Sequence, residues 1–338
     1  MRKSLDRLSV PIIQGGMGIG ISMGSLAGAV AAEGGMGVIS TANIGFREPD
    51  YMTDTEAANT RALVREIKKA REISGSRGLV AINAMVATTN FTGMIRTAVR
   101  NGIDAVISGA GLPLELPDAA GGDVLIAPIV SGARAAKLIT KHWAKRFGRK
   151  PDFTVVEGYK AGGHLGFKPE ELESGAVQEL AEAVHEVAES AEEPVFAAGG
   201  VFDVNDIKAM HREGAAGVQM ATRFIATHEC DATQGFKDVI LEAKKEDVAV
   251  IKSPVGMPGR AVRTELIKKM ESGIKAAPDK CVRCIKTCDP ARTPYCINRA
   301  LISAFFGDRE NGLFFCGDNV DRVNGMMSVH ELIKELST

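Results

Sequence analysis

Aromatic side chains are scarce in this sequence, as are long apolar runs and any excess of charge of one sign. Phe, Trp and Tyr together make up 5% of the 338 residues, which argues against a nucleic-acid surface built on stacked rings. The formal net charge of -1 offers no electrostatic attraction to nucleic acid. No apolar run approaches the ~20 residues of a membrane span, and the N-terminus lacks the apolar core of a signal peptide. We therefore expect a cytoplasmic protein that binds neither nucleic acid nor a membrane.

Glycine, by contrast, is abundant at 37 residues, and much of it directly follows short apolar runs. Eight such runs, typical of strands buried on both faces, alternate with stretches of helical spacing. The runs are 10–13, 36–39, 79–82, 105–107, 124–127, 153–156, 194–197 and 217–220, and the helical stretches include 26–32, 56–73, 133–147, 172–191 and 204–211. This order predicts an α/β fold of the TIM (β/α)8 barrel type, since a doubly wound sheet normally uses fewer strands.

The chain beyond about residue 231 does not continue this alternation. We expect a ligand-binding barrel over 1–231 and an appended, mainly helical, cysteine-containing segment over 232–326 that covers part of the barrel mouth. A C-terminal helix within 327–338 is expected to return to the barrel, with Ser328 as its N-cap.

The residues that follow the predicted strands are unusual, and barrel active sites are built from these loops. They include Gly15-Gly16-Met17-Gly18 after the first strand, Asn83 after the third, Ala198-Gly199-Gly200 after the seventh and Ala221-Thr222 after the eighth. Barrels commonly bind phosphate at the loops after strands seven and eight, and the chain has neither a Rossmann nor a Walker A motif. We therefore predict bound FMN, with its ring near Gly16, Asn83 and Gly163. The alternative is that the glycine pairs form plain turns and Asn83 caps the next segment.

A histidine follows the sixth predicted strand in the run Glu157-Gly158-Tyr159-Lys160-Ala161-Gly162-Gly163-His164. Glycine lets the backbone approach a flat ligand where a Cβ would collide, and His is the side chain best suited to proton exchange near neutral pH. His164 is therefore the candidate proton-transfer residue. The alternative is a tight turn followed by a structural histidine.

Five motifs, in the same order along the chain, carry a family resemblance. They are Pro11–Met17, Ser108–Gly111, Glu157–Gly166, Ala197–Val201 and Gly217–Phe224, with a weaker likeness at Met257–Val262. They resemble the nitronate monooxygenase family, formerly the 2-nitropropane dioxygenases, which includes the flavin-dependent type II enoyl-acyl carrier protein reductases. The chain departs from the family pattern at Lys160, where a carboxylate or small residue is usual, and at Ala221, where glycine is usual.

The resemblance implies an FMN-binding TIM barrel with a small second domain over its mouth. Gly199-Gly200 and Ala221-Thr222 would hold the phosphate, Asn83 and Gln219 would contact the flavin, and His164 would lie beside the reactive ring. The full set of implied cofactor residues is Gly16, Met17, Gly18, Asn83, Glu157, Ala161, Gly162, Gly163, Ala198, Gly199, Gly200, Gln219, Met220, Ala221 and Thr222.

Three functions compete at this point. The first is an FMN-dependent nitronate monooxygenase that oxidises alkyl nitronates with O2. The second is an NAD(P)H-dependent reductase of an enoyl thioester carried on coenzyme A or on an acyl carrier protein, or a related NAD(P)H:flavin oxidoreductase. The third is a non-catalytic flavin- or metal-binding regulatory protein, which the motifs disfavour. The sequence does not determine the oligomeric state, and a homodimer is one possibility.

Four of the six cysteines cluster as Cys281-x2-Cys284-x3-Cys288-x7-Cys296. This spacing suits zinc or an iron–sulfur cluster, and a cytosolic context argues against structural disulfides. The alternative is reduced thiols packed in the appended segment.

Basic residues gather between Lys137 and Lys150, around Trp143. The simplest interpretation is a solvated helix face; the alternative is a docking surface for an acidic carrier protein or for coenzyme A phosphates.

Overall fold

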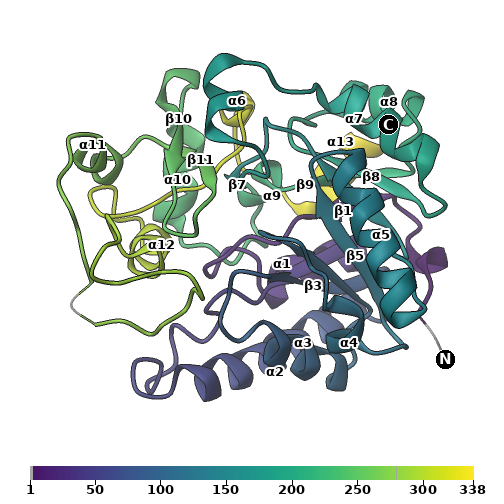
Figure 1. Ribbon diagram of the computed structural model, residues 1–338, viewed down its shortest axis with the longest axis horizontal. Coiled ribbons are helices and arrows are strands. Elements are labelled where there is room, and N and C mark those ends of the chain that lie inside the picture. Colours follow the sequence, from purple (N-terminus) through teal and green to yellow (C-terminus); the bar gives the residue numbers. More distant parts are fainter. Residues whose placement is uncertain (1–2, 279) are drawn as a thin grey trace.

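Eight parallel strands close into a barrel (Figure 1). The computed structural model describes residues 3–278 and 280–338. The barrel strands are β1 (Ile12–Gln14), β2 (Met36–Ser40), β3 (Leu79–Met85), β4 (Ala105–Gly109), β5 (Leu125–Val130), β6 (Thr154–Glu157), β8 (Val195–Ala198) and β9 (Gly217–Met220). β9 closes the barrel by pairing with β1, which places Ile13 opposite Gln219. The predicted TIM barrel and its eight predicted strands are confirmed.

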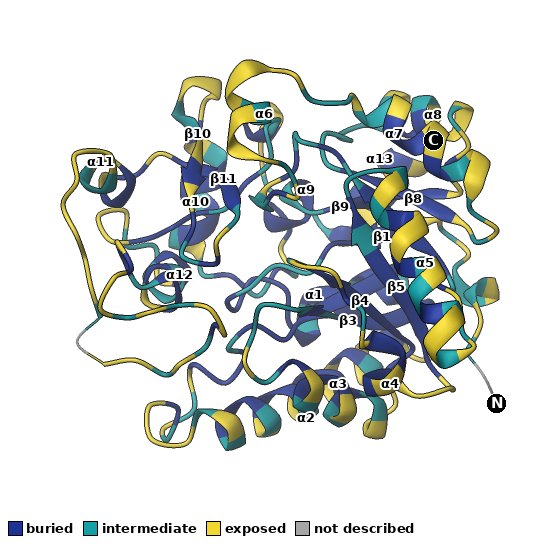
Figure 2. Cartoon of the chain, viewed as in Figure 1, coloured by how far each residue is buried: buried dark blue, intermediate teal, exposed yellow. Residues whose placement is uncertain are grey.

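Helices cover the outside of the barrel and turn their buried faces toward the strands (Figure 2). They are α1 (Gly24–Ala32), α2 (Thr55–Ser74), α3 (Phe91–Arg100), α4 (Leu116–Ala120), α5 (Ala133–Phe147), α7 (Leu180–Ser190), α8 (Val204–Arg212) and α9 (Thr222–Ile225). The short helix α6 (Pro169–Ser174), which precedes α7, has no buried residue. The predicted single helix over 172–191 is wrong. Gly175, with φ of +72°, ends α6, and α7 begins only at Leu180. The other four predicted helices are confirmed.

Apolar side chains fill the inside of the barrel. Every strand except β9 contributes to this cluster, which includes Ile13, Met36, Leu79, Ile107, Phe153 and Phe196. Phe153 and Phe196 pack edge to face, with ring centroids 5.5 Å apart. Because the interior is solid, a ligand has to bind at an end of the barrel, among the loops.

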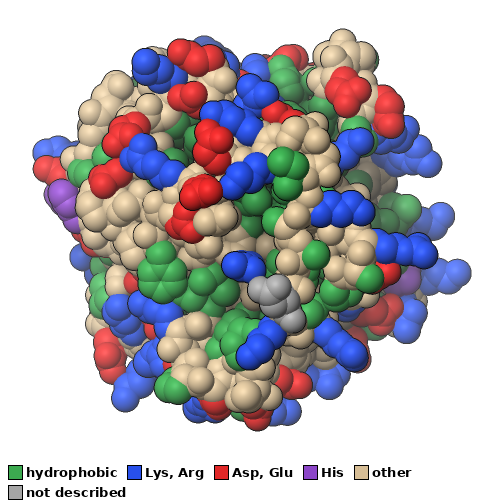
Figure 3. Space-filling view, turned by 90° about the vertical axis from the view of Figure 1, so that its left-hand side faces the viewer, with side chains coloured by type: hydrophobic (Ala, Val, Ile, Leu, Met, Phe, Trp, Pro, Cys, Tyr) green, Lys and Arg blue, Asp and Glu red, His purple; other side chains and the backbone are tan. Residues whose placement is uncertain are grey.

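The appended segment combines helices with an antiparallel hairpin. Its elements are α10 (Gln234–Glu242), η2 (Lys245–Asp247), β10 (Val248–Lys252), β11 (Pro258–Val262), α11 (Glu265–Glu271), α12 (Ile297–Phe305) and η3 (Val320–Arg322), and η1 (Leu5–Arg7) precedes the barrel. The sequence did not predict the hairpin, because β10 is only partly buried and β11 begins at a proline. Figure 3 looks onto the left-hand side of Figure 1 and shows basic and acidic side chains interspersed on that face.

The hairpin also reaches the predicted histidine loop. β7 (Gly163–His164) leaves the barrel and pairs with β11, so that Gly259 lies opposite His164. The backbone N–H of Leu165 continues this contact by donating to the Pro258 carbonyl at 2.8 Å. The appended segment therefore holds the loop that carries His164.

The last helix, α13 (Val329–Ser337), packs against α1 and α8 of the barrel. Ser328 caps it as predicted: its hydroxyl accepts a hydrogen bond from the Glu331 N–H, and the Glu331 carboxylate accepts one from the Ser328 N–H. Within the described residues, no helix combines the length and the apolar character that a membrane crossing requires. The domain boundaries at residues 231 and 326 stay proposals.

Candidate active site

Two adjoining pockets open among the loops at the carboxyl ends of the barrel strands. We call them the His164 pocket and the Gly199 pocket, after one residue of each. Among the predicted cofactor and catalytic residues, those that line only the His164 pocket are Gly16, Met17, Gly18, Asn83, Gly163 and His164. Those that line only the Gly199 pocket are Ala161, Ala198, Gly199, Gly200 and Met220. Those that line both pockets are Glu157, Gly162, Gln219, Ala221 and Thr222. The five shared residues make the two pockets one continuous site. Every residue of the predicted set thus lies in one place.

Glycine is required where the histidine loop meets the appended segment. A Cβ built on Gly162 would lie 2.4 Å from the carbonyl carbon of Cys316 and 2.6 Å from the Gly317 nitrogen. These neighbours are backbone atoms, so no side-chain rotation relieves the overlap. Gly199 and Gly200, which pack against the same loop at Ala161 and Lys160, have φ of +83° and +110°, a region that favours glycine. Gly162, Gly199 and Gly200 are thus positions where the backbone favours or requires glycine.

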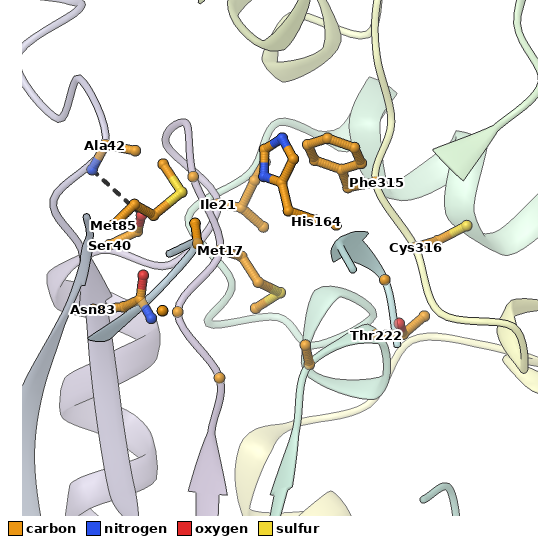
Figure 4. Close-up of a pocket in the computed structure, with 18 of the residues that line it drawn as sticks. Met17, Ile21, Ser40, Ala42, Asn83, Met85, His164, Thr222, Phe315 and Cys316 are labelled. Atoms are coloured by element: carbon orange, nitrogen blue, oxygen red, sulfur yellow. Dashed lines mark hydrogen bonds between the residues drawn. The ribbon is translucent and has the colours of Figure 1, made fainter. Parts of the chain in front are cut away.

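His164 projects into its pocket beside the ring of Phe315 (Figure 4). The two rings meet edge to face with centroids 5.2 Å apart. Nε2 of His164 lies 2.8 Å from Oγ of Ser253, which orients the imidazole. Burial lowers the pKa of His164 to about 4, so the ring is neutral at pH 7.

Glu157 lies at the end of β6, where the two pockets meet. Its strand register places it opposite Ala198, which in turn pairs with Gln219 on β9. Burial alone raises the pKa of Glu157 to about 8. The carboxyl group is therefore largely protonated at pH 7 and faces a space lined by backbone and amide groups.

Arg260 of β11 ties the appended segment to the histidine loop. Its buried guanidinium donates to the carbonyl of Tyr159 and, at 2.9 Å, to the carbonyl of Ala161. Asp318 lies 3.8 Å from its Nε. Asn319 makes a similar connection across the site, because its amide donates to the Gly200 carbonyl at 2.8 Å.

Sequence reasoning missed several residues of the site. Ser253, Phe315, Cys316 and Asn319 all come from the appended segment and had no local motif to mark them. Arg260 lay within the weak family likeness at 257–262, which was the one available signal.

Lys160, the departure from the family pattern, lines the Gly199 pocket. Its ammonium lies 5.3 Å from the centre of the Tyr159 ring and 3.5 Å from the Glu179 carboxylate. The stem of Lys160 is the nearest neighbour of Gly200. A cationic side chain thus borders the glycine backbone.

The four clustered cysteines line a third cavity, in the appended segment. Burial raises the pKa of the Cys284 thiol to about 11, and the neighbouring Cys296 adds to the rise. Among residues 3–278 and 280–338, no three His, Cys, Asp or Glu side chains are placed to hold one metal ion. The predicted zinc site is therefore not supported by this arrangement.

The basic stretch from Lys137 to Lys150 forms much of α5. Trp143 is fully buried and donates to the Pro113 carbonyl at 3.0 Å. Arg146 pairs with Glu115 and Lys150 with Glu192. These contacts favour a solvated helix face over a docking surface.

A family model matches nearly the whole chain, and curated relatives align with parts of it. The family model "Nitronate monooxygenase" matches residues 2–338. A "Probable nitronate monooxygenase" of Staphylococcus saprophyticus is 33% identical over 129 residues, 38% of this chain and 36% of that protein. A "(3aS,4S,5R,7aS)-5-hydroxy-7a-methyl-1-oxo-octahydro-1H-indene-4-carboxyl-CoA dehydrogenase" of Mycobacterium tuberculosis is 31% identical over 268 residues, 79% of this chain. The chain spans 66% of the length of that relative.

Solved structures resemble the fold. FabK from Thermotoga maritima has a TM-score of 0.75 at 24% identity, covering 98% of this chain and 93% of FabK. A nitroalkane oxidase from Streptomyces ansochromogenes has a TM-score of 0.76 at 19% identity, covering 98% of this chain and 96% of that protein. With the family model matching residues 2–338, the chain belongs to the nitronate monooxygenase family of oxidoreductases.

Proposed function

We propose that the protein is an FMN-dependent oxidoreductase that oxidises alkyl nitronates with O2. The observation that carries this proposal is the continuous site formed by the His164 and Gly199 pockets. One pocket offers glycine backbone beside a cation, and the other offers a histidine among apolar walls. A flavin mononucleotide has the matching parts, namely a phosphate at one end and a flat ring at the other.

The residues fit FMN in three respects. Gly199 and Gly200 adopt left-handed backbone next to Lys160, an arrangement suited to an anion. Gly162 packs directly against the backbone of Cys316 and Gly317, so main chain without a side chain lines both pockets at this position. Glu157 presents a carboxyl group raised in pKa by burial alone, and hydroxyl groups of a ribityl chain would supply the hydrogen bonds that this group needs.

The proposed binding mode follows the two pockets. Gly199, Gly200, Ala221 and Thr222 would hold the phosphate, Glu157 and Gln219 would face the ribityl chain, and the ring would lie near Gly16, Asn83, Gly163 and His164. FMN would supply the electron transfer at this site. The protein's own side chains would bind and orient FMN and the substrate and would transfer protons.

His164 is the proposed proton-transfer residue. With a pKa of about 4, it is neutral at pH 7 and is a weak base, so it is poorly suited to removing a proton from a neutral nitroalkane. A nitronate reaches the site already deprotonated, so its oxidation does not begin with removal of a proton from carbon. The hydrogen bond to Ser253 fixes the ring in position for the proton transfers that remain. This favours nitronates over nitroalkanes as substrates.

The second candidate is an NAD(P)H-dependent enoyl thioester reductase or a related NAD(P)H:flavin oxidoreductase. The relative that aligns over 79% of this chain is named as a carboxyl-CoA dehydrogenase, which favours a thioester substrate. The walls of the His164 pocket include Ile21, Ile129, Leu313 and Phe315, and such walls also suit an acyl chain. This candidate differs from the first because it consumes a pyridine nucleotide.

Anaerobic mixing separates the two candidates. Purified protein loaded with FMN is mixed without oxygen with propane-2-nitronate, and separately with NADH or NADPH, while flavin absorbance near 450 nm is followed. The proposal expects rapid bleaching by the nitronate and slow or no bleaching by either pyridine nucleotide. Bleaching by NADH or NADPH alone would instead establish the reductase, and failure to bind FMN would remove both candidates.

A further inference from the structure

The segment that carries the four clustered cysteines has almost no regular structure of its own. We call residues 275–296 the cysteine loop; residue 279 lies outside the described part. The rest of the loop contains no helix or strand. A loop of this length inside a compact domain requires some other means of holding its shape.

The cysteine loop is packed against the connection that follows β3. The Thr89 N–H donates to the Cys284 carbonyl at 3.0 Å, and the Lys286 N–H donates to the Ala87 carbonyl at 3.0 Å. Thr88 forms an isolated bridge with Ile285. Met85, which precedes this connection, lines the His164 pocket. The conformation of the loop is thus linked to a wall of the active site.

All four cysteines face one cavity in this loop. One of them accepts a hydrogen bond there: the Arg283 N–H donates to Sγ of Cys281 at 3.3 Å. A donor directed at sulfur stabilises a metal-bound thiolate and orients it.

The backbone between the first two cysteines is shaped for this arrangement. Arg283 adopts φ of +50°, a left-handed conformation that is uncommon for a residue other than glycine. It turns the chain so that the Arg283 N–H meets Cys281 while Cys284 faces the same cavity. Strain of this kind persists where the surroundings over-determine it and often marks a binding site.

A zinc ion and an iron–sulfur cluster place different demands on their cysteine ligands. A single zinc ion needs four ligands at ~2.3 Å from one centre. In the described part of the chain, no three potential ligands are placed to hold one ion. The ligands of an iron–sulfur cluster bind different iron atoms and do not converge on one point. Four cysteines around a cavity therefore suit a cluster rather than a zinc ion.

Charge in the cavity is compatible with bound thiolates. Arg283 and Lys286 line it together with one carboxylate, Asp289. The Lys286 ammonium also donates to the Val86 carbonyl at 2.8 Å, which holds this cation beside the loop. Two cations against one carboxylate favour an anionic cluster.

We propose that Cys281, Cys284, Cys288 and Cys296 bind an iron–sulfur cluster that fastens the cysteine loop to the connection after β3. The cluster would be bound preassembled, with each thiol releasing its proton as its sulfur binds iron. This inference does not depend on FMN or on the nitronate reaction.

The test is the metal content of protein purified without oxygen from cells supplied with iron. We expect about two to four iron atoms per chain and an equal amount of acid-labile sulfide. The Cys281→Ser/Cys284→Ser double variant should lose at least nine-tenths of both. The matched control is Cys230→Ala, since Cys230 is buried elsewhere and contacts the Ile21 carbonyl; it should keep both.

A second measurement covers the case in which the double variant fails to fold. Wild-type protein is treated with iodoacetamide under native conditions, before and after removal of iron by a chelator, and the modified cysteines are identified by mass spectrometry. We expect the exposed Cys281 and its three partners to react only after iron is removed. Three results with wild-type protein would each overturn the proposal. They are zinc as the only bound metal, less than about 0.1 metal atom per chain, and equal alkylation of the four cysteines before and after chelation.

Discussion

The substitution Gly162→Ala is the sharpest test of how the active site is assembled. The added methyl would lie 2.4 Å from the Cys316 carbonyl carbon, 2.6 Å from its oxygen and 2.6 Å from the Gly317 nitrogen. Non-bonded heavy atoms normally lie about 3.5–4.0 Å apart, so the histidine loop and the Cys316 segment must separate by roughly 1 Å. Those segments are held together beside Gly162 by a hydrogen bond from the Asp318 N–H to the Lys160 carbonyl at 3.0 Å.

Two consequences follow from this separation. Overpacking of a closely packed contact costs about 1–3 kcal/mol, which should lower the Tm of the variant by several degrees. A displacement of roughly 1 Å at His164, two residues along the chain, should lower kcat/KM by about 10²-fold. FMN affinity should also fall, because Gly162 lines both pockets.

The assay compares Gly162→Ala with Gly122→Ala. A Cβ on Gly122 would meet nothing within 4 Å, so this control should match wild type in thermal unfolding and in steady-state oxidation of propane-2-nitronate. A Gly162→Ala variant with the Tm and kcat/KM of the control would refute the close contact between the histidine loop and the appended segment.

Three further predictions concern the side chains of the site. His164→Ala should still bind FMN but lose about 10²–10⁴-fold in turnover. In the wild-type protein, kcat/KM should fall only as the pH is lowered toward the His164 pKa of about 4. A fall centred near pH 6.5, about the pKa of an exposed histidine, would contradict the burial of the ring. Folding raises the pKa of Glu157 from 4.5 to about 8, so between these pH values the folded apoprotein keeps a proton that the unfolded chain loses. The Tm of the apoprotein should therefore decline as the pH rises through that interval. In Glu157→Gln this part of the decline should vanish, and an unchanged Tm profile would count against a buried carboxyl group. Lys160→Met should weaken FMN binding about tenfold without changing riboflavin binding. Fluorescence titration measures both affinities, with Lys150→Met as the surface control. Equal losses of affinity for both ligands would mean that Lys160 does not face the phosphate.

The barrel and its ligand-binding end could be predicted because their signals are local. Strands buried on both faces leave continuous apolar runs, and the carboxyl ends of barrel strands meet at one rim. Glycines and His164 that follow such runs therefore lie together whatever the details of the loops. Gly175 gave a local signal for the end of α6, but the helical spacing on either side of it masked the break.

The remainder of the site depends on long-range packing. Ser253 and Phe315 contact His164 from segments about 90 and 150 residues away in sequence, and no local pattern indicates which face of the appended segment meets the barrel. The hairpin that pairs with β7 left little signal in the sequence, because β10 is only partly buried and β11 begins at a proline. The cytoplasmic location and the homodimer stay predictions.

In the proposed binding mode, the joined pockets hold FMN with its phosphate at Gly199 and Gly200. The most direct measurement is a titration of the apoprotein with FMN and with riboflavin, which differ only in that phosphate, followed by quenching of flavin fluorescence. Charge-assisted hydrogen bonds to the phosphate contribute about 1.5–3 kcal/mol each, so we expect FMN to bind at least about 100-fold more tightly than riboflavin. Equal affinity for the two flavins, or no binding of either, would contradict this binding mode.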